Sequence, residues 1–415
     1  MNNVQLDGDL SLSYNQLMSL DTVTVDTLPE KKGVIMKHTE YLVRSTNFSS
    51  SAQRRYTDFE VFYDLLVARY PYRMVPRLPP KKIGMTDHFI SERRRALARF
   101  LNIISRHPVL RKDPIVQFFF TVEVHDFHIH LKDKFKNCLD EFVTNPDKDR
   151  IEEQLNVVSG DVNGMKTELN NMLRSVTVLR DLSERWVSRT KAAAYDLQMY
   201  SNELSVLAGE GQTVSAWSSH KGDAWSKLRE GMRGISAQFS NLSERVGRQR
   251  IEEDAGILEN IALLLDILQG VKDLVDRREK GVNKEHQQAF NRVQQLKKQK
   301  GTMAASGQGA GTGIQEKIEQ QESLINNIGL RNNFSVLCLH WEMKQVYTYL
   351  SHFGVIWNSF VKTQLSAHND LGNLWQGTGK FTNLMTSAQS SAPISYQAAQ
   401  PSAPPGYNGP SFYDM

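Results

Sequence analysis

Apolar and polar residues alternate along the first part of the chain. DTVTVDT (Asp21–Thr27) and VIMKHTEYLVR (Val34–Arg44) both show this alternation, and the turn-forming PEKKG lies between them. A period of two is typical of half-buried strands. We therefore expect an antiparallel meander of three strands, the third of which ends at Arg55.

Helical spacing replaces this alternation at Asp58, and the apolar positions are then Phe59, Phe62, Tyr63, Leu65 and Leu66. The proline-rich YPYRMVPRLPPKK interrupts the pattern. Further helices are expected at about His88–Arg106 and at Pro114–Thr121. Strands followed by a few helices predict a small α+β domain over residues about 21–122. Residues 1–20 are polar and predict a flexible N-terminal arm.

A heptad pattern dominates the rest of the chain. Apolar residues recur in steps of three and four at Leu155, Val158, Val162, Met165, Leu169, Met172, Val176 and Leu179. The same rhythm returns from Leu228 to Val246 and from Val346 to Phe360. Breaks near Gly209–Ser215 and Gly301–Gly313 separate three long amphipathic helices, so residues 146–382 predict an all-α domain. Such long helices expose more apolar seam than three of them can cover, which predicts a dimer.

The positive charge of the chain is concentrated in its first domain. Residues 51–115 hold 14 Lys and Arg against 6 Asp and Glu, whereas the whole chain has a net charge of +4. A basic domain indicates an anionic partner, either a nucleic acid or a phosphorylated lipid surface. No apolar run reaches the roughly 20 residues that cross a bilayer, so we expect peripheral membrane contact. The two cysteines, Cys138 and Cys338, fit a reducing compartment.

The sequence lacks the usual signatures of enzymes, metal sites and nucleic-acid readers. His125, His128 and His130 do not share one helical face, which argues against a metal site. The glycine-rich stretch from Gly301 lacks the Lys and Ser or Thr of a phosphate-binding loop, and no nucleophile elbow occurs. We therefore expect a non-enzymatic protein without a cofactor and without a nucleic-acid partner.

Three basic residues stand where separate elements are expected to meet. Arg55 ends the third strand, Lys81 lies in the proline-rich loop and Arg93 opens the second helix. Together they predict a pocket for phosphate, which favours charge-assisted and bidentate donors. Tyr56 offers a flat face to a sugar-like ring. The alternative, ordinary solvated charge, stays open because Arg and Lys are mostly exposed in proteins.

RRYTDF, PRLPPKK and ERRRALARFLNIISRHP, in this order and spacing, resemble the PX domain of the sorting nexins over residues about 21–122. The resemblance implies that phosphatidylinositol 3-phosphate is the ligand. It assigns the 3-phosphate to Arg55, the face of the inositol ring to Tyr56, a position at the head group to Thr57, the 1-phosphate to Lys81 and the ring hydroxyls to Arg93. Lys82 is an alternative to Lys81. Ile83, Gly84 and Met85 are expected either to dip into the bilayer or to form an ordinary loop.

The first domain and its proline-rich loop are similar to the sorting nexin 8 subgroup, and the three helices behind them resemble a BAR domain. This resemblance implies an elongated antiparallel dimer that acts as a peripheral protein on the cytoplasmic face of early endosomes. There the PX domain would read the lipid and the BAR dimer would sense or generate curvature during retrograde transport. The alternative is a cytosolic coiled-coil scaffold whose PX domain binds protein.

The segment between the two domains, residues 123–145, predicts an amphipathic linker helix. Its apolar stripe includes Phe127, Leu131 and Phe135, with Lys132 and Lys136 at the side. Two interpretations stay open: a helix that inserts into a membrane interface, and a helix packed on the core of the BAR domain.

The C-terminal segment, residues 383–415, is poor in charge and rich in Ser, Ala and Pro, which predicts disorder. It contains PSAP (Pro401–Pro404) and the overlapping PPGY, which includes Pro404, Pro405 and Tyr407. These motifs resemble ligands of the UEV domain of ESCRT-I and of WW domains, which bind polyproline II segments.

Overall fold

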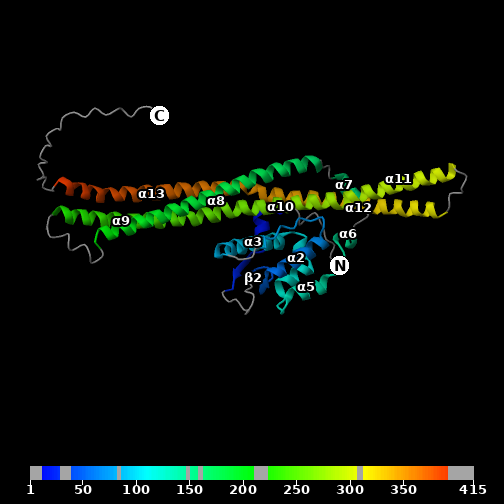
Figure 1. Ribbon diagram of the computed structural model, residues 1–415, viewed down its shortest axis with the longest axis horizontal. Helices are drawn as coiled ribbons and strands as arrows, with labels where there is room; N and C mark the ends of the chain where they lie inside the picture. Colours follow the sequence, from blue (N-terminus) through cyan, green and yellow to red (C-terminus); the bar gives the residue numbers. More distant parts are fainter. Residues whose placement is uncertain are drawn as a thin grey trace, which may run out of the picture. The chain divides into compact units, whose positions relative to one another are not determined.

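The computed structural model describes residues 12–28, 39–81, 86–145, 150–157, 162–209, 223–305 and 312–390. The chain divides into two compact units (Figure 1). The first comprises Met1–Val187 and Glu253–Val361, and the second comprises Ser188–Glu252 and Lys362–Met415. Pro401, Pro404, Pro405 and Tyr407 of the predicted partner motifs, and Ile83 and Met85 of the predicted membrane loop, lie outside the described residues.

The sheet of the first unit is the predicted meander. Strands β1 (Val23–Thr27), β2 (Glu40–Ser45) and β3 (Ser50–Arg55) pair antiparallel in the order β1-β2-β3. Val25 lies opposite Val43, and Val43 lies opposite Ala52. All three side chains are buried, so one face of the sheet forms the core.

Three helices pack on this face: α2 (Tyr56–Arg69), α3 (Asp87–Arg106) and α4 (Pro114–Thr121), with the short 3-10 helix η1 (Leu110–Lys112) before α4. Thr86 caps α3, and Asp113 caps α4 just before Pro114. The core between sheet and helices is rich in aromatic side chains: Tyr41, Phe59, Phe62, Phe100, Phe119 and Phe120. The helices lie where the apolar spacing predicts them.

The linker is not one amphipathic helix. It forms α5 (Phe127–Phe135) and α6 (Glu141–Thr144), with residues 136–140 in neither helix. Phe127, Leu131 and Phe135 are buried and join the aromatic core beneath the sheet. In this structure they are therefore not available for insertion into a membrane. The segment is packed, as in the second interpretation of the sequence. It packs, however, on the core of the α+β domain and not on the core of the long helices.

Part of the predicted flexible arm is a docked helix, α1 (Tyr14–Ser19), whose N-cap is Ser13. The Tyr14 ring stacks on His352 with the ring centres 3.7 Å apart, and Leu17 is buried in the core of the long helices. For residues 12–20 the prediction of a flexible arm is therefore wrong. Leu12, Met18 and Leu20 also pack against this core, so the apolar side chains of the segment dock it.

The three predicted long helices are present. The first, α8 (Val162–Leu207), follows α7 (Ile151–Val157). The second runs without a break through α9 (Asp223–Glu253), α10 (Glu259–Arg278) and α11 (Lys284–Ala305), and two π-helical segments, η4 (Asp254–Leu258) and η5 (Glu279–Asn283), join its parts. The third consists of α12 (Thr312–Ser351) and α13 (Phe353–Ser390). No helix among the described residues has the length and apolarity needed to cross a bilayer.

The second unit is a close-packed part of these three helices. The hydroxyls of Ser201 and Ser236 each donate to the backbone carbonyl of the other residue, at 2.8 and 2.7 Å, and so join α8 to α9. At Gly231 and Gly234 of α9 an added Cβ would overlap Met385 and Phe381 of α13. Small residues thus bring the helices together.

Candidate phosphate-binding site

Arg55 lies at the junction of β3 and α2. It is the last residue of the strand and the N-cap of the helix. Its backbone N–H donates to Oδ2 of Asp58 at 2.7 Å, which fixes the start of the helix. Its side chain is 42% exposed, and Nε donates to Oε1 of Glu40 at 2.9 Å. The guanidinium is thus held by one edge and leaves further N–H groups for a ligand.

Tyr56 is the point at which the strand end, the proline-rich loop and α3 meet. Its hydroxyl donates to the carbonyl of Pro79. The guanidinium of Arg93 lies 4.6 Å from the centre of its ring, and Nζ of Lys81 lies 5.9 Å from it. Burial raises the pKa of Tyr56, so the hydroxyl stays protonated and donates. The exposed Thr57 follows on the helix.

Lys81 and Arg93 differ in how they are held. Lys81 is 63% exposed, and its Nζ lies 2.9 Å from Oε2 of Glu60. Arg93 is buried, and its Nη2 donates to the carbonyl of Pro80 at 3.0 Å. Its Nε is buried without a hydrogen-bond partner in the described structure. An unpaired donor beside a charged guanidinium is costly unless a ligand or water completes it.

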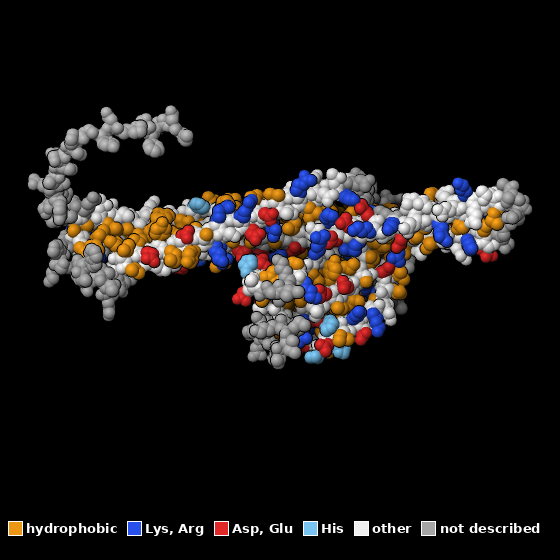
Figure 2. Space-filling model, viewed as in Figure 1, with side chains coloured by type: hydrophobic (Ala, Val, Ile, Leu, Met, Phe, Trp, Pro, Cys, Tyr) orange, Lys and Arg blue, Asp and Glu red, His pale blue; other side chains and the backbone are white. Residues whose placement is uncertain are grey.

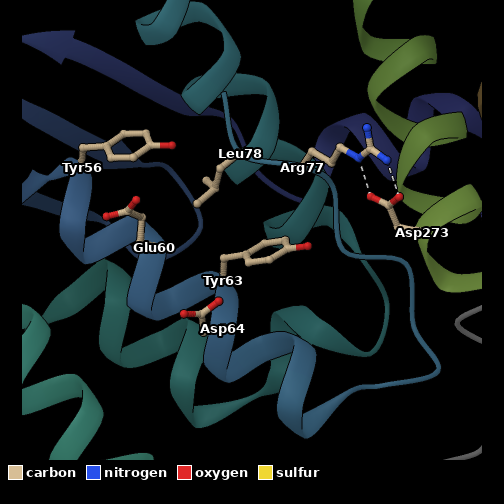
Figure 3. Close-up of a pocket in the computed structure, with 7 residues that line it drawn as sticks. All are labelled: Tyr56, Glu60, Tyr63, Asp64, Arg77, Leu78 and Asp273. Carbon is tan, nitrogen blue, oxygen red and sulfur yellow. Dashed lines mark hydrogen bonds and ion pairs between the residues drawn. The ribbon is translucent and has the colours of Figure 1, made fainter. Parts of the chain in front are cut away.

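The site opens into a cleft of about 550 Å³ (Figure 3). Tyr56 and Glu60 form one end of its lining, and the other residues are Tyr63, Asp64, Arg77, Leu78 and Asp273. Asp273 belongs to α10, so a long helix contributes to the wall of a cleft that begins at the α+β domain.

Arg54 has a role that the sequence did not reveal. It is 1% exposed, and its guanidinium donates to the carbonyls of Phe119 and Val122 at the end of α4. It also lies 3.7 Å from the centre of the Phe127 ring. Burial lowers the pKa of Arg54 to about 10. The first arginine of RRY thus closes the core, and only the second faces the site.

Most of the basic charge predicted to meet an anionic partner is used within the protein. Arg69 pairs with Asp113, and Arg73 pairs with Glu141 and Glu342. Three more arginines reach the second long helix: Arg77 to Asp273, Arg95 to Asp254 and Glu259, and Arg99 to Glu259 and Asp266. The number of basic residues in the domain therefore does not locate the ligand site. The basic residues that lie around Tyr56 are Arg55, Lys81 and Arg93.

An acidic stripe on α10 receives these arginines. Glu259, Asp266 and Asp273 are spaced by seven residues and so lie on one side of the helix. Met74 packs on Gly270 between the last two, where a Cβ would come within 3.0 Å of the methionine side chain. The seven-residue spacing is visible in the sequence, but it does not say that the partner is the first domain.

A buried polar network joins the first domain to α12. His107 accepts hydrogen bonds at Nδ1 from the backbone N–H of Val109 and Leu110, so Nε2 carries the proton and donates to Glu342 at 3.1 Å. Arg73 lies on the other side of Glu342, at 3.5 Å. Burial alone would raise the pKa of Glu342, but His107 and Arg73 reverse this and the pKa lies below its ordinary value.

The histidines near α5 form no metal site. His125 pairs with Asp126, and His128 lies 3.4 Å from Asp58. Across the described residues no group of three His, Cys, Asp or Glu side chains is placed to hold a metal ion.

Two family models match the chain. The PX domain matches residues 42–123, and the sorting nexin 8/Mvp1 BAR domain matches residues 137–386. The fold is thus that of a sorting nexin with a PX and a BAR domain.

Individual relatives place the chain more closely. It is 36% identical to sorting nexin-8 of Bos taurus over 370 residues, which cover 88% of this chain and 81% of the relative. It is equally identical to sorting nexin-8 of Homo sapiens over 372 residues, 88% of this chain and 80% of the relative. Sorting nexin MVP1 of Kluyveromyces lactis is 30% identical over 272 residues, 62% of this chain and 52% of the relative.

The solved structure titled "The cryo-EM structure of the SNX-BAR Mvp1 tetramer" has the same fold, with a TM-score of 0.64 at 19% identity, over 86% of this chain and 99% of that one. The chain belongs to the sorting nexin 8/Mvp1 family. Sorting nexins are peripheral proteins of endosomal membranes and act as scaffolds, and the two domains fit endosomal sorting and membrane curvature.

Proposed function

We propose that this protein binds phosphatidylinositol 3-phosphate through Arg55, Tyr56, Thr57, Lys81 and Arg93, and that a BAR dimer adds a response to curvature. The observation that carries the proposal is the position of Lys81 and Arg93 over the Tyr56 ring, with Arg55 immediately before it. The aromatic face suits the apolar side of an inositol ring, while the cations suit its phosphates.

The state of the cations supports the same assignment. Nη2 of Arg93 donates to the carbonyl of Pro80, which leaves other N–H groups of the guanidinium for ring hydroxyls. Arg55 and Lys81 are partly exposed and paired with Glu40 and Glu60. Exposed ion pairs are weak, about 0.2–1 kcal/mol each, so the 3-phosphate monoester at Arg55 and the singly charged phosphodiester at Lys81 displace them readily.

Exposed apolar side chains on the long helices support an antiparallel homodimer. Figure 2 shows apolar side chains over α9 and α13. In the second unit the large exposed ones are Tyr195, Met199, Tyr200, Val206, Leu207, Ile251, Leu365 and Trp375. Contiguous exposed apolar surface is typical of an interface. A dimer would carry two lipid sites, and effective concentration would make modest single-site affinity sufficient for membrane recruitment.

The proposed place of action is the cytoplasmic face of early endosomes, where the protein would form tubules and retrieve cargo along the retrograde route. The C-terminal PSAP and PPGY motifs are proposed to recruit ESCRT-I or WW-domain proteins. If this is right, Pro404→Ala, which alters both motifs, weakens pulldown of both domain types. Unchanged pulldown of both would contradict it.

Co-sedimentation with liposomes tests the proposal. Vesicles with phosphatidylinositol 3-phosphate or with unphosphorylated phosphatidylinositol, each at two diameters, are compared for wild type and Arg55→Ala. We expect binding that needs the phosphate and Arg55 and that increases on the smaller vesicles. Equal binding with and without the phosphate would favour the alternative, a scaffold whose PX domain binds protein.

A further inference from the structure

We propose that Asp273 of α10 is a positioning residue for the lipid site: it holds the proline-rich loop through Arg77 and so sets the position of Lys81. The inference rests on the proposed function. It makes the affinity for phosphatidylinositol 3-phosphate a property of the PX and BAR domains together.

The loop is tied to α10 at Arg77. Arg77 donates from Nε and Nη2 to the two carboxylate oxygens of Asp273, at 2.6 and 2.5 Å (Figure 3). This bidentate geometry fixes the orientation as well as the distance of the guanidinium. The Asp273 side chain is 17% exposed and the Arg77 side chain 54%, so the helix side of the pair is the more rigid.

The same loop reaches the lipid site four residues later. The carbonyls of Pro79 and Pro80 accept hydrogen bonds from Tyr56 and Arg93, and Lys81 pairs with Glu60. Residues 77–81 belong to no helix or strand, so these side-chain contacts hold them.

The loop is stiff enough to transmit a displacement. Pro76, Pro79 and Pro80 fix their φ angles and remove much of its freedom. From Arg77 to Lys81 an extended chain spans only about 13 Å. A shift of Arg77 therefore moves the carbonyls that orient Tyr56 and Arg93, and with them Nζ of Lys81. Coupling of this kind is reciprocal, so bound lipid would also strengthen the tie to α10.

The chain offers a matched control on the same helix. Asp266 lies seven residues before Asp273 and pairs with Arg99 of α3 at 2.7 Å. Both carboxylates receive an arginine of the PX domain, but only Asp273 receives one from the loop. Asp273→Arg and Asp266→Arg thus remove comparable ion pairs and differ in whether the loop is released.

The experiment measures binding of the full chain to phosphatidylcholine vesicles that contain phosphatidylinositol 3-phosphate or, as a reference, phosphatidylinositol. Asp273→Arg is expected to weaken the phosphate-dependent binding roughly threefold or more, and Asp266→Arg to change it less than twofold. The charge exchange Arg77→Asp with Asp273→Arg should restore most of the loss. In a Lys81→Ala background, Asp273→Arg should cause a smaller loss than it does in wild type, because the part of the effect that acts through Lys81 is already gone.

Equal losses of phosphate-dependent binding in Asp273→Arg and Asp266→Arg would overturn the coupling, and so would a loss from Asp273→Arg that is as large in the Lys81→Ala background as in wild type. Asp273 would then serve only to dock the PX domain on α10. Asp273→Asn, which keeps the shape of the side chain, should show a smaller loss in the same direction, and serves if Asp273→Arg does not fold. If wild type requires the phosphate but both Asp273 variants bind like wild type, the coupling is wrong and the lipid site stands. If wild type ignores the phosphate, both proposals are wrong.

Discussion

The backbone N–H of Arg55 donates to Asp58 at 2.7 Å, so the residue proposed to hold the 3-phosphate also begins α2. The other oxygen of Asp58 accepts the backbone N–H of His128 at 3.1 Å, which ties α5 to the same point. One buried carboxylate thus fixes both the lipid site and the linker.

Removing this carboxylate should affect stability and binding together. Asp58→Ala loses two hydrogen bonds to backbone N–H groups and should lower the free energy of unfolding by about 1–2 kcal/mol. The affinity for phosphatidylinositol 3-phosphate should fall although Arg55 is intact. Denaturant unfolding and vesicle binding check both effects. Glu203→Ala, which removes an exposed acid of α8 outside the cleft lining, is the control, and an equal loss in it would contradict the account.

The two adjacent arginines should separate folding from binding. Arg54→Ala leaves the carbonyls at the end of α4 without their buried donor and should cost about 2–4 kcal/mol of unfolding free energy. Arg55→Ala removes a partly exposed side chain and should change stability by less than about 0.5 kcal/mol while abolishing phosphate-dependent binding. Thermal unfolding and lipid binding of both variants test this. Equal destabilisation by the two would refute the assignment.

Close packing of α9 on α13 gives a second matched pair. Gly234→Ala would place a methyl group against the Phe381 ring and should destabilise the second unit by about 1–3 kcal/mol. Gly247, on the same helix, has no atom within 4 Å of an added Cβ. Gly247→Ala should therefore stabilise the protein by about 0.5–1 kcal/mol through helix propensity. Thermal unfolding of both variants tests this: the midpoint should fall for Gly234→Ala and rise for Gly247→Ala. Shifts of the same sign would be inconsistent with this packing.

The network at Glu342 predicts a dependence on pH. Glu342→Gln leaves Arg73 and His107 with a neutral partner and should cost about 3 kcal/mol at neutral pH. The pKa of Glu342 is lower in the folded state than its ordinary value of 4.5, so the unfolded state binds more protons in this range. The stabilisation of wild type relative to Glu342→Gln is thus complete above about pH 4.5. It is lost as the pH falls through the pKa of Glu342 in the folded state. Urea unfolding of both proteins from pH 7 down to about pH 3 should show that the difference in unfolding free energy shrinks below about pH 4.5, and a constant difference would contradict the assignment.

The sequence predicts the α+β domain well because its patterns are local. Strand alternation, the prolines around the loop and the caps at Thr86 and Asp113 all act within a few residues. The sequence predicts that the strand end, the proline-rich loop and the second helix could line one pocket, and the structure places Lys81 and Arg93 at the Tyr56 ring.

What the sequence could not give depends on partners distant in the chain. The apolar stripe that contains Phe127 must pack against other apolar residues, but its periodicity does not say to which core they belong. The excess of Arg and Lys does not distinguish Arg54, held by carbonyls, from Arg55, held near the surface. Nor do the acids on α10 reveal that their partners precede them by more than 150 residues.

The most direct test of the central claim compares Arg55→Ala with wild type in cells that contain early endosomes, with the oligomeric state of both proteins measured in solution. The account predicts that the variant keeps the dimer and its stability but no longer concentrates on endosomes. A variant that still dimerises and still reaches endosomes would contradict the claim that Arg55 and the lipid it binds direct the protein there.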